Sequence, residues 1–518
     1  ALSAVVISSD GKKMVYSVSE SGSDWVEWHV RDVDSGKDLP DVIKWSKFSG
    51  ASWTKDNAGF FYAAYDEPKS EEAFKMSNLN QKLYYHKLGT PQSEDRLIYK
   101  NDDEPKWGFW GEVSDDGKFL VVYIRQGTLR RVNITLISLV NPDAAPIDLM
   151  TGFQAIYDYV GNDDDTCYFF TDDDAPMNRV IAVDLNNPAR ENWQTVIAEQ
   201  AQTLQNVSLV SGKFLCTYLK DAQSVLRVYD TGGNLVDEPA APEMGTITGF
   251  GGSPNDKDVF FHYASYATPG TIYRYDVVKQ EVELFRAPQL NFNPEDYVTK
   301  QVFYPSKDGT MIPMFISHRK DLEINSETPV HLYGYGGFNI VRAPEFTVPF
   351  LTWMELGGIF AVANLRGGGE YGKAWHEAGT KHQKQNVFDD FIAAGEWLIK
   401  EGYTSKEKLS IRGRSNGGLL VGACITQRPD LYGAAIGVVG VMDMLRFTKF
   451  TIGWAWVSDY GSPDDPEEFK TLLSYSPYHN VKPGTEYPPT MIITADHDDR
   501  VFPAHSFKFG AEMQWAQA

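Results

Sequence analysis

A short apolar and aromatic strand pattern recurs six times in the first ~280 residues, and this repeat constrains the fold more than any other feature. The copies begin at residues 13, 59, 118, 166, 213 and 258, and a second strand pattern follows each copy. Polar turns rich in Asp, Asn or Gly precede several of them. Short, evenly spaced strands with polar turns are typical of β-propeller blades. We therefore expect a β-propeller with about six blades over residues 1–290, the alternative being an irregular β-sandwich.

The pattern changes between residues 286 and 297, and strands alternate with helices beyond that point. Residues 330–333 and 359–364 are apolar runs bounded by Gly-rich turns, which indicates buried strands. Apolar residues between 388 and 399 have helical spacing, and Gly402 follows them. Two more apolar strands are expected at 434–439 and 490–495. The chain is too long for one core, and residues 291–518 predict a second, doubly wound α/β domain.

The stretch from Leu409 to Gly418 carries the clearest chemical signal. An apolar strand pattern runs into Gly413-Arg-Ser-Asn-Gly417, and an apolar helical stretch follows directly. This is a G-x-S-x-G nucleophile elbow in the strand–turn–helix setting that the motif requires. The glycines permit a strained turn, and free N–H groups at the helix start can stabilise an oxyanion. Ser415 is the candidate nucleophile.

Composition excludes several classes of function. The formal net charge of −22 repels phosphate backbones and anionic lipid, so we expect no nucleic-acid partner and no membrane partner. No apolar run approaches the roughly 20 residues that a membrane-spanning helix needs. The three cysteines are too few and scattered for a disulfide framework, and no Cys/His cluster has zinc-ligand spacing. We expect a cytoplasmic protein without metal or cofactor.

The partners of the serine are less clear. In this fold the acid follows a later strand, and Asp496, Asp498 and Asp499 all follow the strand pattern at 490–495. The spacing alone does not choose among them. Of the histidines near or beyond the acid, His497 lies among the aspartates and His505 starts a helix, so we expect structural roles for both. The chain therefore lacks an evident general base.

Several motifs closely resemble the prolyl oligopeptidase family, and the resemblance covers nearly all 518 residues. In the propeller half the similarity is seen at residues 81–86. In the second half the matching motifs are Tyr333-Gly-Tyr-Gly-Gly-Phe338, Arg366-Gly-Gly-Gly-Glu-Tyr-Gly372, Ser415-Asn-Gly-Gly418, Met442-Asp-Met444, Trp456 with Asp459-Tyr-Gly461, and Ala495-Asp-His-Asp-Asp-Arg-Val501. The resemblance implies a seven-bladed propeller that covers an α/β-hydrolase domain. Relative to that pattern we expect a fragment that lacks the first blade, an N-terminal hydrolase segment and a C-terminal segment with the catalytic His.

The resemblance also implies roles for individual residues. Ser415 would be the nucleophile and Asp498 the acid, while the Tyr335 hydroxyl and the Asn416 N–H would stabilise the oxyanion. Trp456 would stack on the substrate proline, and Arg500 would hold a substrate carbonyl. The rest of the pocket would be lined by Phe338, Val441, Tyr460 and Val501. Core packing of the aromatic residues and a salt bridge from Arg500 to a neighbouring aspartate are the alternatives.

One position departs from the family pattern, which usually has Gly before the nucleophile where this chain has Arg414. We expect the elbow to fold with Arg414 at this position. The sequence does not decide whether this bulky cation alters the pocket.

The resemblance implies a monomeric serine endopeptidase that cleaves short proline-containing peptides on the carboxyl side of proline, through an acyl-enzyme. The propeller would admit oligopeptides and exclude folded proteins. The 518 residues alone are expected to be inactive for want of the His. Three alternatives stay open. They are a related hydrolase specific for basic residues, an acyl-peptide hydrolase or esterase, and a non-catalytic binding protein with a relic hydrolase domain.

Overall fold

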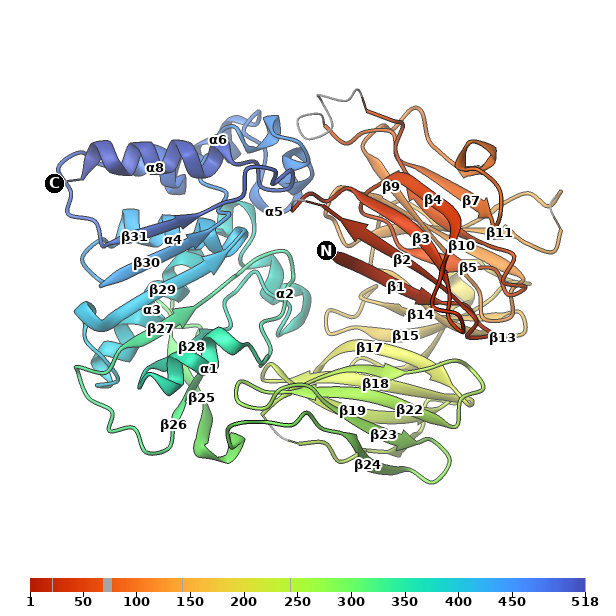
Figure 1. Cartoon of the computed structure of the whole chain (residues 1–518), viewed down its shortest axis with the longest axis horizontal. Coiled ribbons are helices and arrows are strands. Elements are labelled where there is room, and N and C mark those ends of the chain that lie inside the picture. Colours follow the sequence, from red (N-terminus) through yellow and green to blue (C-terminus); the bar gives the residue numbers. More distant parts are fainter. Residues whose placement is uncertain (21, 69–76, 142, 243, 518) are drawn as a thin grey trace.

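The computed structural model describes residues 1–20, 22–68, 77–141, 143–242 and 244–517. Its first part consists of six four-stranded sheets, each built from four strands that are consecutive in the chain (Figure 1). The six recurring patterns form the second strand of each sheet, which confirms the β-propeller prediction. The sheets are β1–β4 (Leu2–Ile7, Lys13–Ser19, Val26–Asp32, Asp38–Ser46), β5–β8 (Ala51–Trp53, Gly59–Ala64, Lys82–Lys87, Arg96–Tyr99), β9–β12 (Trp107–Val113, Phe119–Gln126, Val132–Ser138, Ile147–Met150), β13–β16 (Tyr157–Asp163, Thr166–Thr171, Arg179–Asp184, Gln194–Ile197), β17–β20 (Thr203–Val210, Lys213–Lys220, Gln223–Asp230, Leu235–Asp237) and β21–β24 (Thr246–Gly251, Asp258–Ala264, Thr271–Asp276, Glu281–Arg286).

Hydrophobic clusters between consecutive sheets hold the propeller together. Val121 and Ile134 of β9–β12, for example, share a cluster with Tyr157 and Phe169 of β13–β16. Four further clusters join the other consecutive pairs in the same way. In the part of the chain that the structure describes, no cluster joins β21–β24 to β1–β4. Large apolar side chains are accordingly exposed on both of these sheets, among them Val5, Ile7, Leu284 and Phe285.

The second part of the chain is built on a seven-stranded sheet in the order β25-β26-β28-β27-β29-β30-β31. The strands from β28 to β31 in this order are parallel, whereas β25 and β26 are antiparallel to their neighbours. The central strands are apolar runs because helices cover both faces of a parallel sheet. The strand bounds are Tyr297–Pro305, Met311–Arg319, Val330–Tyr333 (β27), Ile359–Ala363 (β28), Leu409–Arg414 (β29), Ala434–Val438 (β30) and Thr490–Ile493 (β31).

Eight α-helices accompany this sheet among the described residues (Figure 1). Apolar side chains of most helices share one large core cluster with the sheet, whereas Leu351 and Met354 of the first helix pack in a smaller cluster with Phe360. The predicted α/β-hydrolase domain is thereby confirmed. The helices are α1 (Val348–Glu355), α2 (Gly372–Glu377), α3 (Gln385–Lys400), α4 (Asn416–Gln427), α5 (Val457–Tyr460), α6 (Pro466–Tyr475), α7 (Pro477–Asn480) and α8 (Ala504–Ala516). Of the helices described, none is long and apolar enough to span a membrane.

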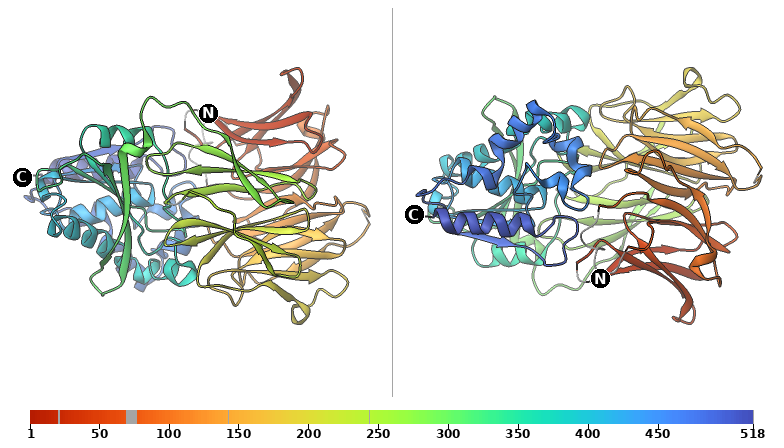
Figure 2. Two further views of the ribbon diagram at one scale, coloured as in Figure 1. Left: turned by 90° about the horizontal axis from the view of Figure 1, so that it is seen from below. Right: turned by 90° about the horizontal axis from the view of Figure 1, so that it is seen from above.

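The two domains lie side by side, as both views in Figure 2 show. Contacts between them come from sheets spread along the propeller. Arg500 bonds to Asp24 beside the first sheet, and Thr128 after β10 donates to the backbone of Ala455. Further along the chain, Tyr371 donates to Asp221. The edge of the α/β sheet that carries the elbow therefore faces the propeller.

Candidate active site

Ser415 occupies the strained turn between β29 and α4. Its backbone has φ 59° and ψ −119°, a conformation that residues other than glycine rarely adopt. The flanking glycines are sterically required. A Cβ at Gly413 would lie 2.0 Å from the carbonyl oxygen of Gly417, and one at Gly417 would lie 2.7 Å from that of Gly334. The turn therefore depends on both glycines of the motif and presents Ser415 at the start of a helix.

The strand next to β29 brings Tyr335 to the same place. β27 runs parallel to β29 with Tyr333 opposite Arg412, so the carboxyl ends of both strands meet at one edge of the sheet. Burial raises the pKa of Tyr335 to about 12, although the nearby Arg342 guanidinium acts in the opposite direction. The phenol is therefore a protonated donor at neutral pH. Asn416 opens α4, where the first backbone N–H groups have no partner within the helix.

A cavity of about 340 Å³ opens beside Ser415 between the two domains. Besides the serine, six of the predicted site residues line it: Tyr335, Phe338, Val441, Trp456, Tyr460 and Arg500. The aromatic rings pack edge to face, with centroids 5.4 Å apart for Phe338 and Tyr460 and 6.4 Å apart for Trp456 and Tyr460. These rings give the cavity an aromatic wall, and the cations Lys106, Arg125 and Arg500 also line it.

Other cavity-lining residues were not predicted. Phe48, Trp107 and Arg125 reach the cavity from the propeller, and Trp454 reaches it from the hydrolase domain. Arg125 is held by a 2.7 Å hydrogen bond from Nη2 to the backbone oxygen of Phe48. No local motif marks these propeller residues, because only the packing of the two domains brings them to Ser415.

The loop after β31 distinguishes the three aspartates. Asp498 is half-buried, and its Oδ1 accepts from the backbone N–H groups of Arg500 at 3.0 Å and Val501 at 2.9 Å. Burial raises the pKa of Asp498 above its ordinary value. Asp496 is exposed and pairs with His497 at 2.8 Å. Val501 is buried beside this loop and does not line the cavity.

Asp499 has a different role, since the propeller binds it. Its carboxylate accepts from Lys47 Nζ at 2.6 Å, from Ser23 Oγ at 3.2 Å and from the backbone N–H of Asp24 at 2.8 Å. The next residue, Arg500, donates through Nε and Nη2 to the Asp24 carboxylate at 2.8 and 2.7 Å. The first propeller sheet thus fixes the loop that carries Asp498.

No histidine is hydrogen-bonded to Ser415, although all ten histidines of the chain lie within the described residues. His505 is buried, and its Nδ1 accepts from the backbone N–H of Asp443 at 3.1 Å. Burial lowers its pKa to about 4, so it is neutral at pH 7. His497 is exposed next to Asp496. The side chain of Arg414, before the nucleophile, is also exposed.

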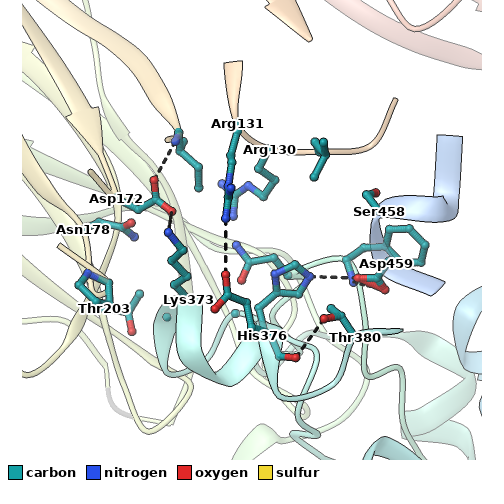
Figure 3. A pocket seen from close by; sticks show the side chains of 18 of the residues that line it. Arg130, Arg131, Asp172, Asn178, Thr203, Lys373, His376, Thr380, Ser458 and Asp459 are labelled. Carbon is teal, nitrogen blue, oxygen red and sulfur yellow. Dashed lines mark hydrogen bonds and ion pairs between the residues drawn. The ribbon is translucent and has the colours of Figure 1, made fainter. Parts of the chain in front are cut away.

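A second cavity, of about 470 Å³, adjoins the first and shares Thr128 and Phe338 with it. Its lining is largely polar, and Figure 3 shows charged side chains from both domains meeting there. Lys373 lies 3.9 Å from Asp172, and Arg131 lies 3.6 Å from Glu377. Both distances exceed those of direct hydrogen bonds, so these ion pairs leave N–H groups available to a ligand.

Comparison with known proteins supports one assignment. The profile described as "Prolyl oligopeptidase, N-terminal beta-propeller domain" matches residues 1–288, and the "Prolyl oligopeptidase family" profile matches residues 344–518. A prolyl endopeptidase of Elizabethkingia meningoseptica is 48% identical over 518 residues, which cover 100% of this chain and 73% of that protein.

Solved structures agree with this result. A structure from a study of two prolyl endopeptidases has a TM-score of 0.95 at 41% sequence identity, and the match covers 100% of this chain and 76% of that chain. Prolyl oligopeptidase B from Galerina marginata, bound to a 35mer hydrolysis and macrocyclization substrate, has a TM-score of 0.94 at 35% identity, covering 100% and 75%. Elbow, sheet and propeller together define a serine peptidase of the α/β-hydrolase class. The chain belongs to the prolyl oligopeptidase family.

Proposed function

We propose that this protein is an endopeptidase that cleaves short peptides on the carboxyl side of proline through an acyl-enzyme. The observation that carries the proposal is the placement of Ser415, in a strained elbow, at a cavity whose wall is formed by Trp456, Phe338 and Tyr460. An aromatic wall suits the flat, apolar ring of proline. The names of the relatives support the same substrate class.

The chemistry follows from the elements of the site. Ser415 Oγ attacks the carbonyl carbon of the proline residue, and the carbonyl oxygen becomes negatively charged. The Tyr335 hydroxyl and the Asn416 N–H donate to this oxygen, and removing one such donor typically costs about 2.7–4 kcal/mol of barrier. The general base takes the proton of the Ser415 hydroxyl and gives it to the amine of the leaving peptide, which departs as the ester to Ser415 forms. Water then hydrolyses the ester and releases the new carboxyl end.

Substrate positioning is assigned to the other lining residues. The proline ring stacks on Trp456, while Phe338, Val441 and Tyr460 enclose it and Val501 supports the wall from behind. Arg500 holds a substrate carbonyl. Its pair with Asp24 uses Nε and Nη2, so among the described residues Nη1 has no partner and is available to the peptide.

The general base is assigned to a histidine oriented by Asp498, in the order of Ser, Asp and His that this fold uses. None of the ten histidines in the described residues is bonded to Ser415. We therefore infer that the 518 residues by themselves do not hydrolyse peptides. We also infer a monomer that acts in the cytoplasm, which the three free, buried cysteines support.

Access to the site is assigned to flexible oligopeptides. The serine cavity and the adjoining polar cavity both lie between the domains, and propeller residues line part of each. A folded protein does not fit into spaces of a few hundred Å³, whereas an extended peptide does.

The test uses the protein produced from its complete gene, together with a Ser415→Ala variant. Both are incubated with peptides that differ only in carrying proline or alanine at one position, and the products are identified by mass spectrometry. Cleavage directly after proline, absent in the variant, is the expected result. Peptide binding without cleavage by the complete protein would instead favour the binding-protein alternative, and cleavage that ignores proline would favour an esterase-like hydrolase.

A further inference from the structure

Lys384 is a buried cation behind the serine, and none of the steps above uses it. The residue directly precedes α3, and its side chain is only 1% exposed. Its Nζ donates to the backbone oxygen of Gly336 at 2.9 Å and to Oδ1 of Asn416 at 3.1 Å. The ring of Tyr460 lies 5.3 Å from Nζ. Every one of these contacts is with a segment that lines or supports the oxyanion site.

Asn416 connects Lys384 to the second oxyanion donor. Its Nδ2 donates to the backbone oxygen of Tyr335 at 2.5 Å, and its Oδ1 also accepts from the Tyr460 hydroxyl at 3.1 Å. The amide is therefore held at both ends. Lys384 thus binds the backbone of Gly336, next to Tyr335, and the side chain of Asn416. Tyr335 and Asn416 are the two residues that would supply the oxyanion donors.

The charge of Lys384 is only partly compensated. The nearest carboxylate, Asp459, lies 3.9 Å from Nζ, beyond direct hydrogen-bond distance. Asp459 instead accepts from the Phe338 N–H at 3.1 Å and is bonded to His376 Nε2 at 3.0 Å (Figure 3). Burying a charge costs several kcal/mol unless it is fully paired. Incompletely paired buried charges concentrate at functional sites.

We propose that Lys384 is a positioning residue of the oxyanion site, and this inference rests on the proposed function of Ser415, Tyr335 and Asn416. Its two hydrogen bonds hold both donors at the place where the oxyanion forms. Its positive charge, in a site from which water is excluded, also favours the negative charge that develops on the carbonyl oxygen. Both effects act on the transition state more than on the bound substrate.

The test compares Lys384→Met with Lys400→Met in the protein produced from its complete gene. Lys400 is the last residue of α3, is exposed and lines neither of the two cavities between the domains, so it serves as the matched control. Substitution of Lys384 removes a charged donor, which is expected to lower kcat about 10- to 100-fold. KM is expected to change less than about threefold, because Lys384 does not line the serine cavity. The control should behave as wild type.

Two inhibitors separate positioning from a general structural role. A peptide aldehyde ending in proline forms a tetrahedral adduct with the serine, whereas the matching peptide alcohol only occupies the pocket. We expect Lys384→Met to weaken binding of the aldehyde by the same factor by which it lowers kcat. Binding of the alcohol should stay unchanged. Equal weakening of both inhibitors, or an unchanged kcat, would overturn the inference. If the wild type does not cleave proline peptides, the proposed function itself fails, which is a distinct result.

A second variant keeps the inference testable if Lys384→Met does not fold. Tyr460→Phe removes one hydroxyl that donates to Asn416 Oδ1 and leaves the ring in place. If the amide of Asn416 positions the donors, this variant should lower kcat and aldehyde affinity together, by a smaller factor than loss of the lysine. An unchanged kcat in Tyr460→Phe would contradict the proposed role of the Asn416 amide in positioning the oxyanion donors.

Discussion

Replacing Tyr335 with Phe is the most informative single perturbation, because it removes one oxygen atom and keeps the ring. The ring contact with Arg342, whose Cζ lies 4.7 Å from the ring centroid, should survive. The lost hydroxyl is one of two proposed oxyanion donors. Losing one such donor raises the barrier by about 2.7–4 kcal/mol, which corresponds to a fall in kcat of roughly 10²- to 10³-fold. KM should change little, since the donor acts mainly on the transition state.

Tyr333→Phe is the matched control. Tyr333 lies two residues earlier, and its ring also lies near Arg342, at 5.4 Å. Neither the nucleophile nor the proposed oxyanion position involves its hydroxyl, so kcat should stay within about twofold of wild type. The assay is steady-state hydrolysis of a fluorogenic proline peptide by the protein from its complete gene, with melting curves to confirm folding. Similar kcat values for the two variants would refute the assignment of Tyr335.

Three further predictions follow. Trp456→Ala should reduce the ratio of kcat/KM for proline peptides over alanine peptides about 10- to 100-fold, because the proline ring of the substrate loses its apolar contact. An unchanged ratio would show that Trp456 does not bind the proline ring. Asp24→Asn should lower kcat/KM about three- to tenfold, because it removes the negative charge and one of the two oxygens that accept from Arg500, and an effect no larger than that of a remote surface substitution would count against it. Burial raises the pKa of Glu112 to about 7, above its unfolded value, so stability is lost as pH rises from about 4.5 towards 7. Glu112→Gln should therefore raise the melting temperature at pH 8 and leave it nearly unchanged at pH 5. Calorimetry showing the reverse would contradict a raised pKa of Glu112.

The parts of the site that depend on local sequence could be predicted. The turn at Ser415 is determined by Gly413 and Gly417, whose missing side chains make room for it, and both are visible in the motif. The propeller could be recognised because each blade repeats the same strand and turn chemistry. In both cases the physical requirement lies within a few residues, or recurs at a fixed interval.

The parts that depend on contacts between distant segments could not be predicted from the residues alone. Asp498 and Asp499 are adjacent and chemically identical. Asp499 binds Lys47, more than 450 residues away, whereas Asp498 accepts from backbone N–H groups of its own loop. Resemblance to the family pointed to Asp498, whereas spacing did not. Lys384 gave no signal, because it lies in a polar stretch typical of an exposed helix start. Its burial results from the packing of α3 against α4, which brings Lys384 to Gly336 and Asn416.

A labelling measurement identifies the nucleophile without relying on mutagenesis. The protein from its complete gene is treated with a peptide phosphonate ending in proline, which forms a stable bond with an activated serine. The modified residue is then located by peptide mass spectrometry. We expect one adduct, on Ser415, with stoichiometric loss of peptidase activity. Modification of another residue, or full inactivation without any adduct on Ser415, would contradict it.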